Sequence, residues 1–287
     1  MRICIITDNK KSYASKKFLQ EARLKNIAVT TTPRKAITLS ELGLLLNKKI
    51  PLTKFDAVIL RSSKNALLPG ILITEYCKHN GVRLLNETFY LRYQTVNKLR
   101  QQLLFQTKKL PHLKTLYGEN ISFSLLKKEF GVPFVAKFSI GSLGRQVFKV
   151  TSKIALEQII KKQKDEKQLC LFQKFYPAGI DYRVFIVGEK IFGPMKRFAP
   201  AGEWKTNIPG SKHARAEKEK KATNLARLFL KKTGIEFAGL DILIDSSGKA
   251  RLIEINTMAC FEVFEKIFPE INIAKETIAL LEKSLRK

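Results

Sequence analysis

The hydrophobic pattern of the first third of the chain alternates between short apolar runs and stretches with helical spacing. The apolar runs predict strands at residues 3–7, 27–31, 57–60 and 82–85, and helical spacing appears at 12–25 and 69–80. Strands that alternate with helices at this pace are typical of a parallel sheet covered by helices. No GxGxxG follows the first strand and no GxxxxGK[ST] occurs, so this unit lacks the usual phosphate-binding loops.

The rest of the chain predicts helices and strands in mixed order. We expect helices at 96–108, 154–162, 217–232 and 273–285. Strands are expected at 132–137, 146–150, 168–176, 181–187, 190–192, from Met195 to 198, 238–244 and 251–256. The pattern therefore indicates an α/β protein, and a chain of 287 residues is long enough for two or three domains.

The two last strands carry polar residues in an otherwise apolar pattern. Residues 238–244 and 251–256 flank a turn rich in Asp, Ser and Gly, which predicts a covered β-hairpin. Side-chain alternation places Glu254 and Asn256 on one face, and the hairpin brings Asp241 back towards them. These hard oxygen ligands suit Mg²⁺. Ordinary acids at the edge of a surface hairpin explain the spacing equally well.

Further candidates for anion binding precede the hairpin. The apolar strand 132–137 ends at Lys137, and two glycines and two serines follow in the loop 138–145. Backbone N–H groups of such a loop can wrap a phosphate, although any hairpin turn can look similar. Lys98 stands at the start of a helix, where anions are favoured. Arg61-Ser62-Ser63 follows a strand at the carboxyl end of the predicted sheet, where ligands tend to bind.

The chain is strongly basic, with a formal net charge of +28 in 287 residues. Residues 1–95 contain 17 basic and 6 acidic residues, residues 96–178 contain 16 and 5, and residues 179–287 contain 20 and 14. The surplus favours an anionic partner such as nucleic acid, an acidic protein tail or phosphates. A lysine-rich solvated surface explains it as well. A hydrophobic content of 45% excludes a disordered basic tail.

Cysteine usage and hydropathy indicate the compartment. The four cysteines, Cys4, Cys77, Cys170 and Cys260, lie far apart without a CxxC pair, which argues against a zinc site or a disulfide framework. The N-terminal apolar run is too short for a signal peptide, and no run reaches the ~18 apolar residues of a membrane span. We therefore expect a cytoplasmic protein without a membrane segment.

One ordered set runs along the chain: Lys98, Lys137, the loop 141–144, the run 173–176, Asp181-x-Arg183, Arg197, Asn207, Asp241, Glu254 and Asn256. This set resembles the ATP-grasp superfamily, and within it the RimK-like carboxylate–amine ligases. The resemblance covers nearly the whole chain and is densest from Lys98 to Asn256. It implies an ATP-grasp fold, with a parallel-sheet pre-ATP-grasp domain at 1–95. The central lobe at 96–178, with its phosphate loop, and the C-terminal lobe at 179–287 would hold ATP between them.

The resemblance also implies a role for each candidate. Arg183 and Arg197 would be catalytic and steady the transferring phosphate and the acyl intermediate. Asp241, Glu254 and Asn256 would be the ligands of Mg²⁺, or of Mn²⁺ in its place. The nucleotide would be bound by Lys98, Lys137, Ser139, Gly141, Ser142, Gly144, Gln173, Lys174, Phe175, Tyr176, Asp181 and Asn207.

The implied activity is the ATP-dependent formation of an amide bond through an acyl phosphate, with ADP as product. We expect an amino acid to be added to an acidic protein or peptide, by an enzyme that forms a homo-oligomer. The alternatives are a small-molecule or carrier-protein ligase, a scaffold that has lost activity, and a basic nucleic-acid-binding protein. No RRM, KH or helix-turn-helix signature supports the last.

Two loops depart from the usual RimK-like pattern. Residues 257–262 stand where relatives usually have a Pro-Gly turn, and Pro209-Gly210-Ser211 stands where they tend to have two glycines. Both loops are expected to face the substrates. The residues expected to bind the nucleotide therefore match the RimK-like pattern more closely than the loops expected to face the substrates.

Overall fold

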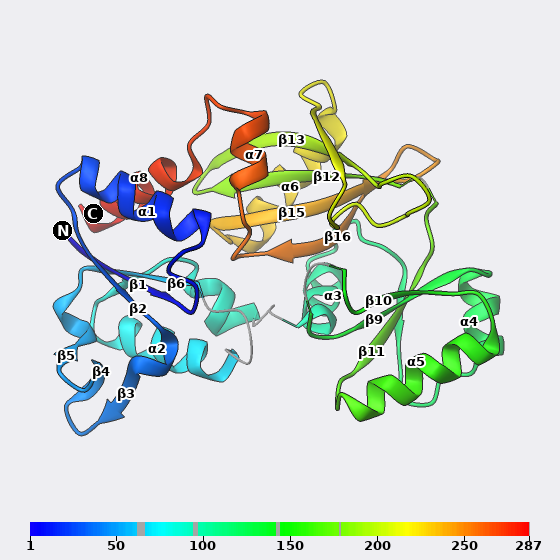
Figure 1. Ribbon diagram of the computed structural model, residues 1–287, viewed down its shortest axis with the longest axis horizontal. Coiled ribbons are helices and arrows are strands. Elements are labelled where there is room, and N and C mark those ends of the chain that lie inside the picture. The colour runs from blue at the N-terminus through cyan, green and yellow to red at the C-terminus, as the bar shows by residue number, and fades with distance from the viewer. Residues whose placement is uncertain (62–66, 94–96, 142–143, 178, 287) are drawn as a thin grey trace.

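A computed structural model describes residues 1–61, 67–93, 97–141, 144–177 and 179–286 (Figure 1). The N-terminal sheet has four parallel strands in the order β2-β1-β6-β7. Their bounds are Arg2–Thr7 (β1), Ala28–Thr32 (β2), Ala57–Arg61 (β6) and Arg83–Leu84 (β7). The parallel sheet that the alternating pattern predicted is therefore confirmed.

Helices cover both faces of the N-terminal sheet. Ile3 and Ile5 of β1 pack in one core cluster with α1 (Tyr13–Leu24) and α8 (Ile273–Leu285). Cys4 and Ile6, which point the other way, pack with α2 (Leu67–His79). Because α8 lies beside α1 (Figure 1), the end of the chain returns to the N-terminal sheet.

A small antiparallel sheet inserted between β2 and β6 was not foreseen. It consists of β3 (Ile37–Ser40), β4 (Gly43–Leu46) and β5 (Ile50–Pro51), with short 3-10 turns at Arg34–Ala36 and Leu52–Lys54. Its strands are only two to four residues long, and Leu39 is 71% exposed. Such short strands with exposed apolar residues give almost no periodic signal.

The central sheet is antiparallel, with the order β10-β9-β11-β8. The strands are β8 (Thr115–Tyr117), β9 (Phe134–Phe138), β10 (Val147–Val150) and β11 (Cys170–Lys174). Helices α4 (Phe123–Phe130) and α5 (Lys153–Asp165) share a core cluster with this sheet. Two helical segments lead into it, a π-helix at Phe89–Tyr93 and α3 (Lys98–Thr107). Helix α4 and strand β8 were absent from the sequence-based expectation.

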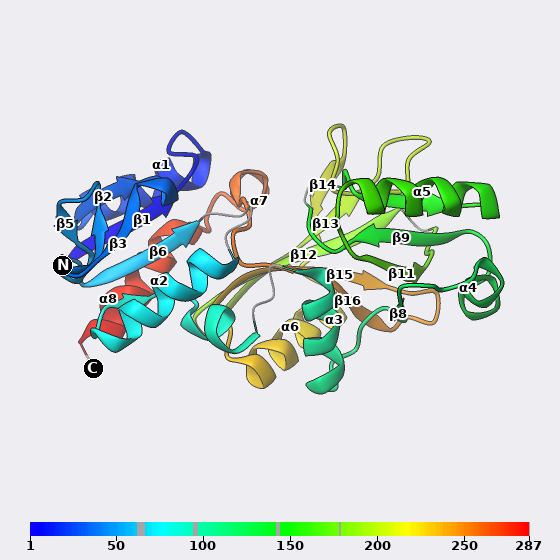
Figure 2. The same ribbon diagram turned by 90° about the horizontal axis from the view of Figure 1, so that it is seen from below.

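The C-terminal sheet has five antiparallel strands in the order β14-β13-β12-β15-β16. Their bounds are Ile180–Val187 (β12), Lys190–Phe198 (β13), Lys212–Arg215 (β14), Phe237–Ile244 (β15) and Ala250–Asn256 (β16). Helix α6 (Lys220–Thr233) packs against four of these strands and covers one face. Part of the other face packs against α8, and the rest is turned towards the central sheet (Figure 2). A short helix, α7 (Glu262–Ile267), follows β16.

Strand β13 differs from the expectation. The sequence analysis placed separate strands at 190–192 and from Met195, because Gly193-Pro194 resembles a break. The structure shows one strand from Lys190 to Phe198. Its pairing with β12 shifts between Arg183 and Phe185, so that Gly193 and Pro194 together stand opposite Val184 and form a β-bulge with one additional residue.

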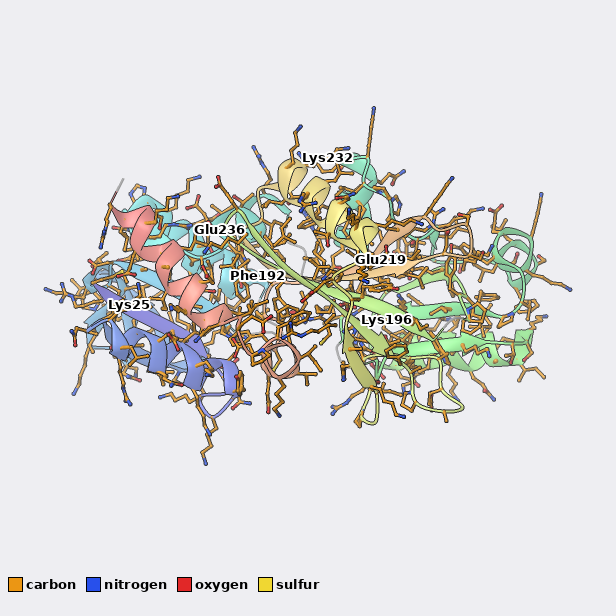
Figure 3. All side chains as sticks on the ribbon, turned by 90° about the horizontal axis from the view of Figure 1, so that it is seen from above. Lys25, Phe192, Lys196, Glu219, Lys232 and Glu236 are labelled. Carbon is orange, nitrogen blue, oxygen red and sulfur yellow. The ribbon has the colours of Figure 1, made fainter. Side chains whose placement is uncertain are left out.

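Ion pairs and a buried amide connect the N-terminal sheet to the third part of the chain. Arg83 pairs with Glu236 at 2.5 Å, and Lys25, directly after α1, pairs with Glu282 of α8. Lys25 and Glu236 are labelled in Figure 3. Asn86 donates to the Phe237 carbonyl at 2.6 Å and accepts from the Phe237 N–H at 2.9 Å. The predicted boundaries at 95 and 178 stay a prediction. Within the described ranges, no helix combines the length and apolar character that a membrane crossing requires.

Candidate functional site

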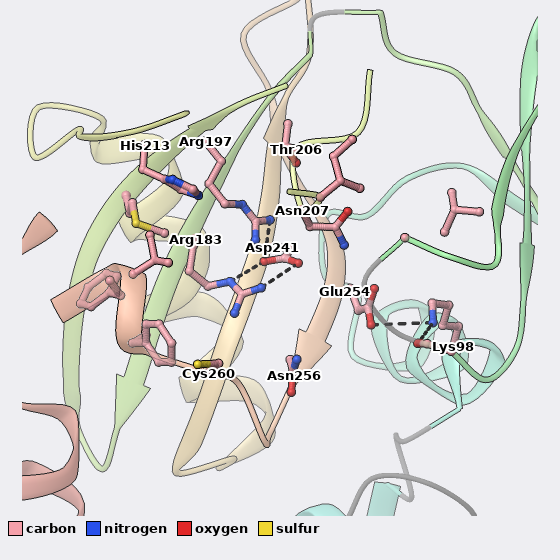
Figure 4. Close-up of a pocket in the computed structure, with 18 of the residues that line it drawn as sticks. Lys98, Arg183, Arg197, Thr206, Asn207, His213, Asp241, Glu254, Asn256 and Cys260 are labelled. Carbon is pink, nitrogen blue, oxygen red and sulfur yellow. Dashed lines mark hydrogen bonds and ion pairs between the residues drawn. The ribbon is translucent and has the colours of Figure 1, made fainter. Parts of the chain in front are cut away.

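Two adjoining cavities lie between the central and C-terminal sheets. The larger has a volume of about 320 Å³ and the smaller about 110 Å³. Both are lined by Gly144, Asn207, Asp241 and Glu254, so they form one continuous site. Figure 4 shows the polar side chains of the larger cavity, which come mainly from β12, β13, β15 and β16.

A carboxylate and an arginine face each other at the centre of the C-terminal sheet. Strand pairing places Arg183 of β12 directly opposite Asp241 of β15. Arg183 Nε donates to Asp241 Oδ1 at 2.6 Å and its Nη2 donates to Oδ2 at 3.1 Å. This two-point geometry fixes the plane of the guanidinium group. The Arg183 side chain is therefore held in the cavity before any ligand binds.

Arg197 of β13 is held by two carboxylates at once. Its Nε and Nη2 donate to Asp181 at 2.6 and 2.7 Å, and Nη2 also lies 2.9 Å from Asp241 Oδ1. Thr206 adds a hydrogen bond to Asp181 Oδ2 at 2.6 Å. Asp181, expected to bind the nucleotide, thus orients Arg197, although it also lines the smaller cavity.

Ion pairing within this cluster determines the charge of Arg197 and of Asp241. Burial opposes the charge on Arg197, but Asp241 and Asp181 outweigh this effect and raise its pKa. Burial also opposes ionisation of Asp241, and Arg183 and Arg197 lower its pKa nevertheless. Arg197 is therefore a cation and Asp241 a carboxylate at neutral pH. Such preorganised charge suits a site where negative charge develops.

The predicted metal ligands all line the larger cavity. The β15–β16 register places Asp241 opposite Glu254, and Asn256 follows two residues later. Their donors are carboxylate and amide oxygens, which fit Mg²⁺. Asp241 Oδ2 and both Glu254 oxygens retain lone pairs for a cation. No group of three or more His, Cys, Asp or Glu in the described part of the chain could hold a metal, so the amide of Asn256 is needed as third ligand.

Both predicted phosphate lysines reach the site. Lys98 Nζ donates to the Gly141 carbonyl at 2.7 Å and lies 3.8 Å from Glu254. Lys137 of β9 lines the smaller cavity. Burial lowers the pKa of Lys137 to about 8, with Glu254 opposing the shift and Lys98 adding to it. A phosphate bound between the two lysines would restore the charge of Lys137.

The glycine-rich loop lies against the loop that carries Asn207. Lys205 Nζ donates to the Gly144 carbonyl at 3.1 Å, and a Cβ on Gly144 would come within 3.1 Å of Asn207 Oδ1. Gly144 has a φ of +66°, which favours glycine. Ser139 is buried, and its carbonyl accepts the N–H of Lys98 at 2.8 Å. Ser142, also predicted to bind phosphate, lies outside the described residues.

The run from Gln173 to Tyr176 borders the smaller cavity. Gln173, Lys174 and Tyr176 line it, whereas the ring of Phe175 packs on Trp204 with centroids 5.4 Å apart. Gln173 Nε2 donates to Thr115 at 2.8 Å. Its Oε1 is buried and has no hydrogen-bond partner among the described residues. An acceptor of this kind is available for a donor on a bound ligand.

Arg61 connects the N-terminal sheet to the loop after Asn256. Its Nη2 donates to the carbonyls of Met258 and Ala259 at 3.0 and 3.3 Å. The N–H of Met258 in turn donates to Asn256 Oδ1 at 2.9 Å. Burial lowers the pKa of Arg61 to about 10, and the group still remains charged at neutral pH. Arg61 was a candidate ligand residue, but in the structure it supports a loop; Ser62 and Ser63 lie outside the described residues.

The sequence analysis missed several residues of the site. Thr206 precedes Asn207 and gives a weak signal, and His213 is one of only three histidines. Both line the larger cavity, together with Cys260 and Phe264. His213 lies on strand β14 and Phe264 on helix α7, and neither element was predicted.

Comparisons with known proteins give one family. A model of the RimK-like ATP-grasp domain matches residues 95–281. A "Probable alpha-L-glutamate ligase" of Nitrosococcus oceani is 28% identical over an alignment 294 positions long, which covers 99% of this chain and 96% of the relative. A "Probable alpha-L-glutamate ligase 2" of Shewanella denitrificans is 27% identical over 297 residues, covering 100% and 97%.

Solved structures share the fold. A RimK domain ATP-grasp protein from Sphaerobacter thermophilus superposes with a TM-score of 0.74 at 15% identity, covering 98% of this chain and 99% of that one. The ATP-grasp ligase PsnB, in complex with a phosphomimetic variant of its minimal precursor, Mg and ADP, superposes with a TM-score of 0.74 at 15% identity. The superposition covers 99% of this chain and 98% of that one. At these identities the likeness establishes the fold alone.

Proposed function

The chain belongs to the RimK-like ATP-grasp family, and on this premise we propose that it adds an amino acid to an acidic protein or peptide. It is an ATP-dependent carboxylate–amine ligase with the ATP-grasp fold, as the order of its motifs predicted. The finer proposal is that ADP and phosphate are the products and that the acceptor carboxylate is activated as an acyl phosphate.

The observation that carries the proposal is the pair of arginines held by Asp181 and Asp241 between the two sheets. A carboxylate resists attack by an amine, so its oxygen must first be converted into a leaving group. Attack of the carboxylate on the γ-phosphate of ATP does this, and it requires positioning and charge neutralisation. Arg183 and Arg197 present fixed positive charge to the transferred phosphate and to the acyl group.

The other side chains take complementary tasks. Lys98 and Lys137 hold the nucleotide phosphates, and Gln173 offers its unpaired oxygen beside the smaller cavity. The loop 139–145 covers the phosphates and keeps water away from the activated carboxylate. Asp241, Glu254 and Asn256 would hold Mg²⁺, with Mn²⁺ able to replace it. The ion would supply positive charge that lowers the repulsion between the phosphates and the incoming carboxylate.

Two kinds of relative support the substrate classes. The proteins from Nitrosococcus and Shewanella are named for glutamate ligation, which supports glutamate as the amine substrate here. PsnB was solved with a minimal precursor, and MdnC of Microcystis aeruginosa with a precursor peptide, which supports a peptide acceptor. The +28 net charge favours an acidic one. Assembly as a homo-oligomer stays a prediction.

The test combines product release with the mass of the acceptor. ATP, Mg²⁺ and glutamate are supplied with an acidic peptide, and ADP and phosphate are measured together with peptide mass. We expect release that requires both substrates, and a peptide that gains glutamyl residues. A Glu254→Gln variant serves as the inactive control. Turnover with small carboxylates or a carrier protein but not with peptides would favour a biosynthetic ligase. Release of AMP would refute the acyl phosphate.

A further inference from the structure

A histidine lines the larger cavity on the side away from the nucleotide phosphates. His213 lies on β14, and the strand register places it directly opposite Arg197 of β13. Directly opposed residues of antiparallel strands point to the same face of the sheet, so the imidazole shares the face of the arginine. Figure 4 shows its ring beside the Arg197 side chain. No other histidine lines either cavity in the described part of the chain.

The surroundings of His213 favour a neutral ring. Burial and then the guanidinium of Arg197 lower the pKa of His213, and Asp181 of β12 opposes this only weakly. The other charged groups nearby are engaged elsewhere. Arg215 on the same strand pairs with Glu217 and Glu270, and Glu262 of α7 pairs with Lys266, while Lys212 is exposed. Helix α7 contributes only the apolar Val263 and Phe264 to this cavity.

The ring is also available for proton transfer. Within the ranges that the structure describes, neither ring nitrogen of His213 has a hydrogen-bond partner. A neutral imidazole therefore presents a free lone pair next to the two arginines that hold the acyl group. The apolar side chains of Phe185, Met195 and Phe264 line the same cavity.

The second half of the proposed reaction needs such a group. An amino acid enters with its amine protonated at neutral pH, and an ammonium group cannot attack a carbonyl. Asp181 and Asp241 are engaged with arginines, and Glu254 faces Lys98. Lys137 lies on the nucleotide side, where phosphate holds it charged. Resting on the proposed ligase function, we propose that His213 is the general base for the attacking amine.

The step balances without a further reactant. A ring nitrogen of His213 takes one proton from the ammonium group, and the free amine nitrogen then attacks the carbonyl carbon of the acyl phosphate. The new C–N bond forms, the bond between the carbonyl carbon and the phosphate oxygen breaks, and phosphate leaves with the electron pair and takes up the second proton of the nitrogen. The imidazolium then passes its proton to water. Positioned bases of this kind contribute about 10²–10⁴-fold to rate.

The experiment separates the amine step from activation of the carboxylate. His213→Gln is compared with wild type, and His79→Gln is the matched control because His79 is exposed at the end of α2. Ligation of glutamate to an acidic peptide is measured beside the formation of peptide hydroxamate with hydroxylamine. Hydroxylamine is largely unprotonated at neutral pH and needs no base, so it reports the acyl phosphate alone.

We expect His213→Gln to lose ligation about 100-fold or more while it keeps hydroxamate formation near the wild-type rate. The wild-type ligation rate should fall in acid as His213 becomes protonated. The variant should not show the fall in ligation rate that follows the pKa of His213. Its rate should instead rise steadily with pH, because the fraction of unprotonated amine rises. Added imidazole should restore part of the ligation rate in His213→Ala.

Two results would overturn the role of His213. Equal loss of ligation and hydroxamate would show that the residue acts on folding or on carboxylate activation. Unchanged ligation across the pH range would show that no base is needed at this position. If wild type itself forms neither hydroxamate nor ADP, the proposed function fails, and the assignment of the base fails with it.

Discussion

Neutralising Asp241 should destabilise the protein, whereas neutralising Glu254 should not, although both substitutions should abolish turnover. Asp241 is 6% exposed and accepts from Arg183 at 2.6 and 3.1 Å and from Arg197 at 2.9 Å. In Asp241→Asn the amide keeps one acceptor oxygen and loses the charge. Arg197 retains Asp181, but Arg183 is left as a buried cation without a carboxylate among the described residues.

The two substitutions should lower the free energy of unfolding by different amounts. Breaking a buried ion pair by removing one partner costs about 3–5 kcal/mol. Because Arg197 keeps one carboxylate, we expect about 3 kcal/mol for Asp241→Asn, a melting temperature lower by roughly 5–10 °C. Glu254 is 27% exposed on its side chain and lies 3.8 Å from Lys98. A partly exposed, long ion pair contributes about 0–1 kcal/mol, so Glu254→Gln should unfold close to wild type.

The assay is thermal and urea denaturation of both variants without nucleotide and with EDTA, beside ADP release. Acid provides a second readout. The pKa of Asp241 is lowered in the folded state, so its contribution is complete above the unfolded pKa of ~3.9 and disappears as pH falls through the folded pKa. The stability gap between wild type and Asp241→Asn should therefore shrink in strong acid. Equal stability of the two variants at neutral pH would refute the network.

Three further outcomes are expected. Affinity of the protein for ADP should weaken as pH rises through about 8, where ligand-free Lys137 loses its proton, and an affinity that is constant from pH 7 to 9 would contradict this. Protease cleavage within residues 139–145 should be suppressed by Mg²⁺ with a non-hydrolysable ATP analogue, and identical digestion would count against a lid. The KM for an acidic peptide should rise steeply with salt, whereas the KM for ATP should change little, since screening reduces the reach of exposed charges to about 8 Å.

The elements with strong periodicity were predictable and the weak ones were not. The apolar runs of β1 and β6 gave the parallel sheet, because a buried parallel strand is apolar on both faces. Helix α4 has only eight residues, and β14 reads Lys-His-Ala-Arg without an apolar run. Both form because neighbouring elements hold them. Local sequence contains little of that information.

The sequence analysis named many of the residues that line the two cavities, but not the contacts between them. The hairpin turn alone brings Glu254 opposite Asp241. The contact between Arg183 and Asp241 depends on β12 lying beside β15, two strands 58 residues apart. A motif order gives the identity of such residues without their partners. It therefore could not show that Asp181 orients Arg197, or that Arg61 supports the loop next to Asn256.

The positive charge of the chain lies mostly outside the two cavities. Among the described residues, six basic and three acidic side chains line the two cavities, a small share of the +28. ATP meets mostly buried groups at short range, where salt screens little. Many of the other basic residues are exposed, and Figure 3 shows side chains that end in nitrogen projecting from the outer surfaces. Their field acts on a partner before contact and attracts an acidic chain without specifying its sequence. For the proposed acidic acceptor, we expect selection among acidic chains to depend on the loops at 209–211 and 257–262, where the sequence departs from the usual RimK-like pattern.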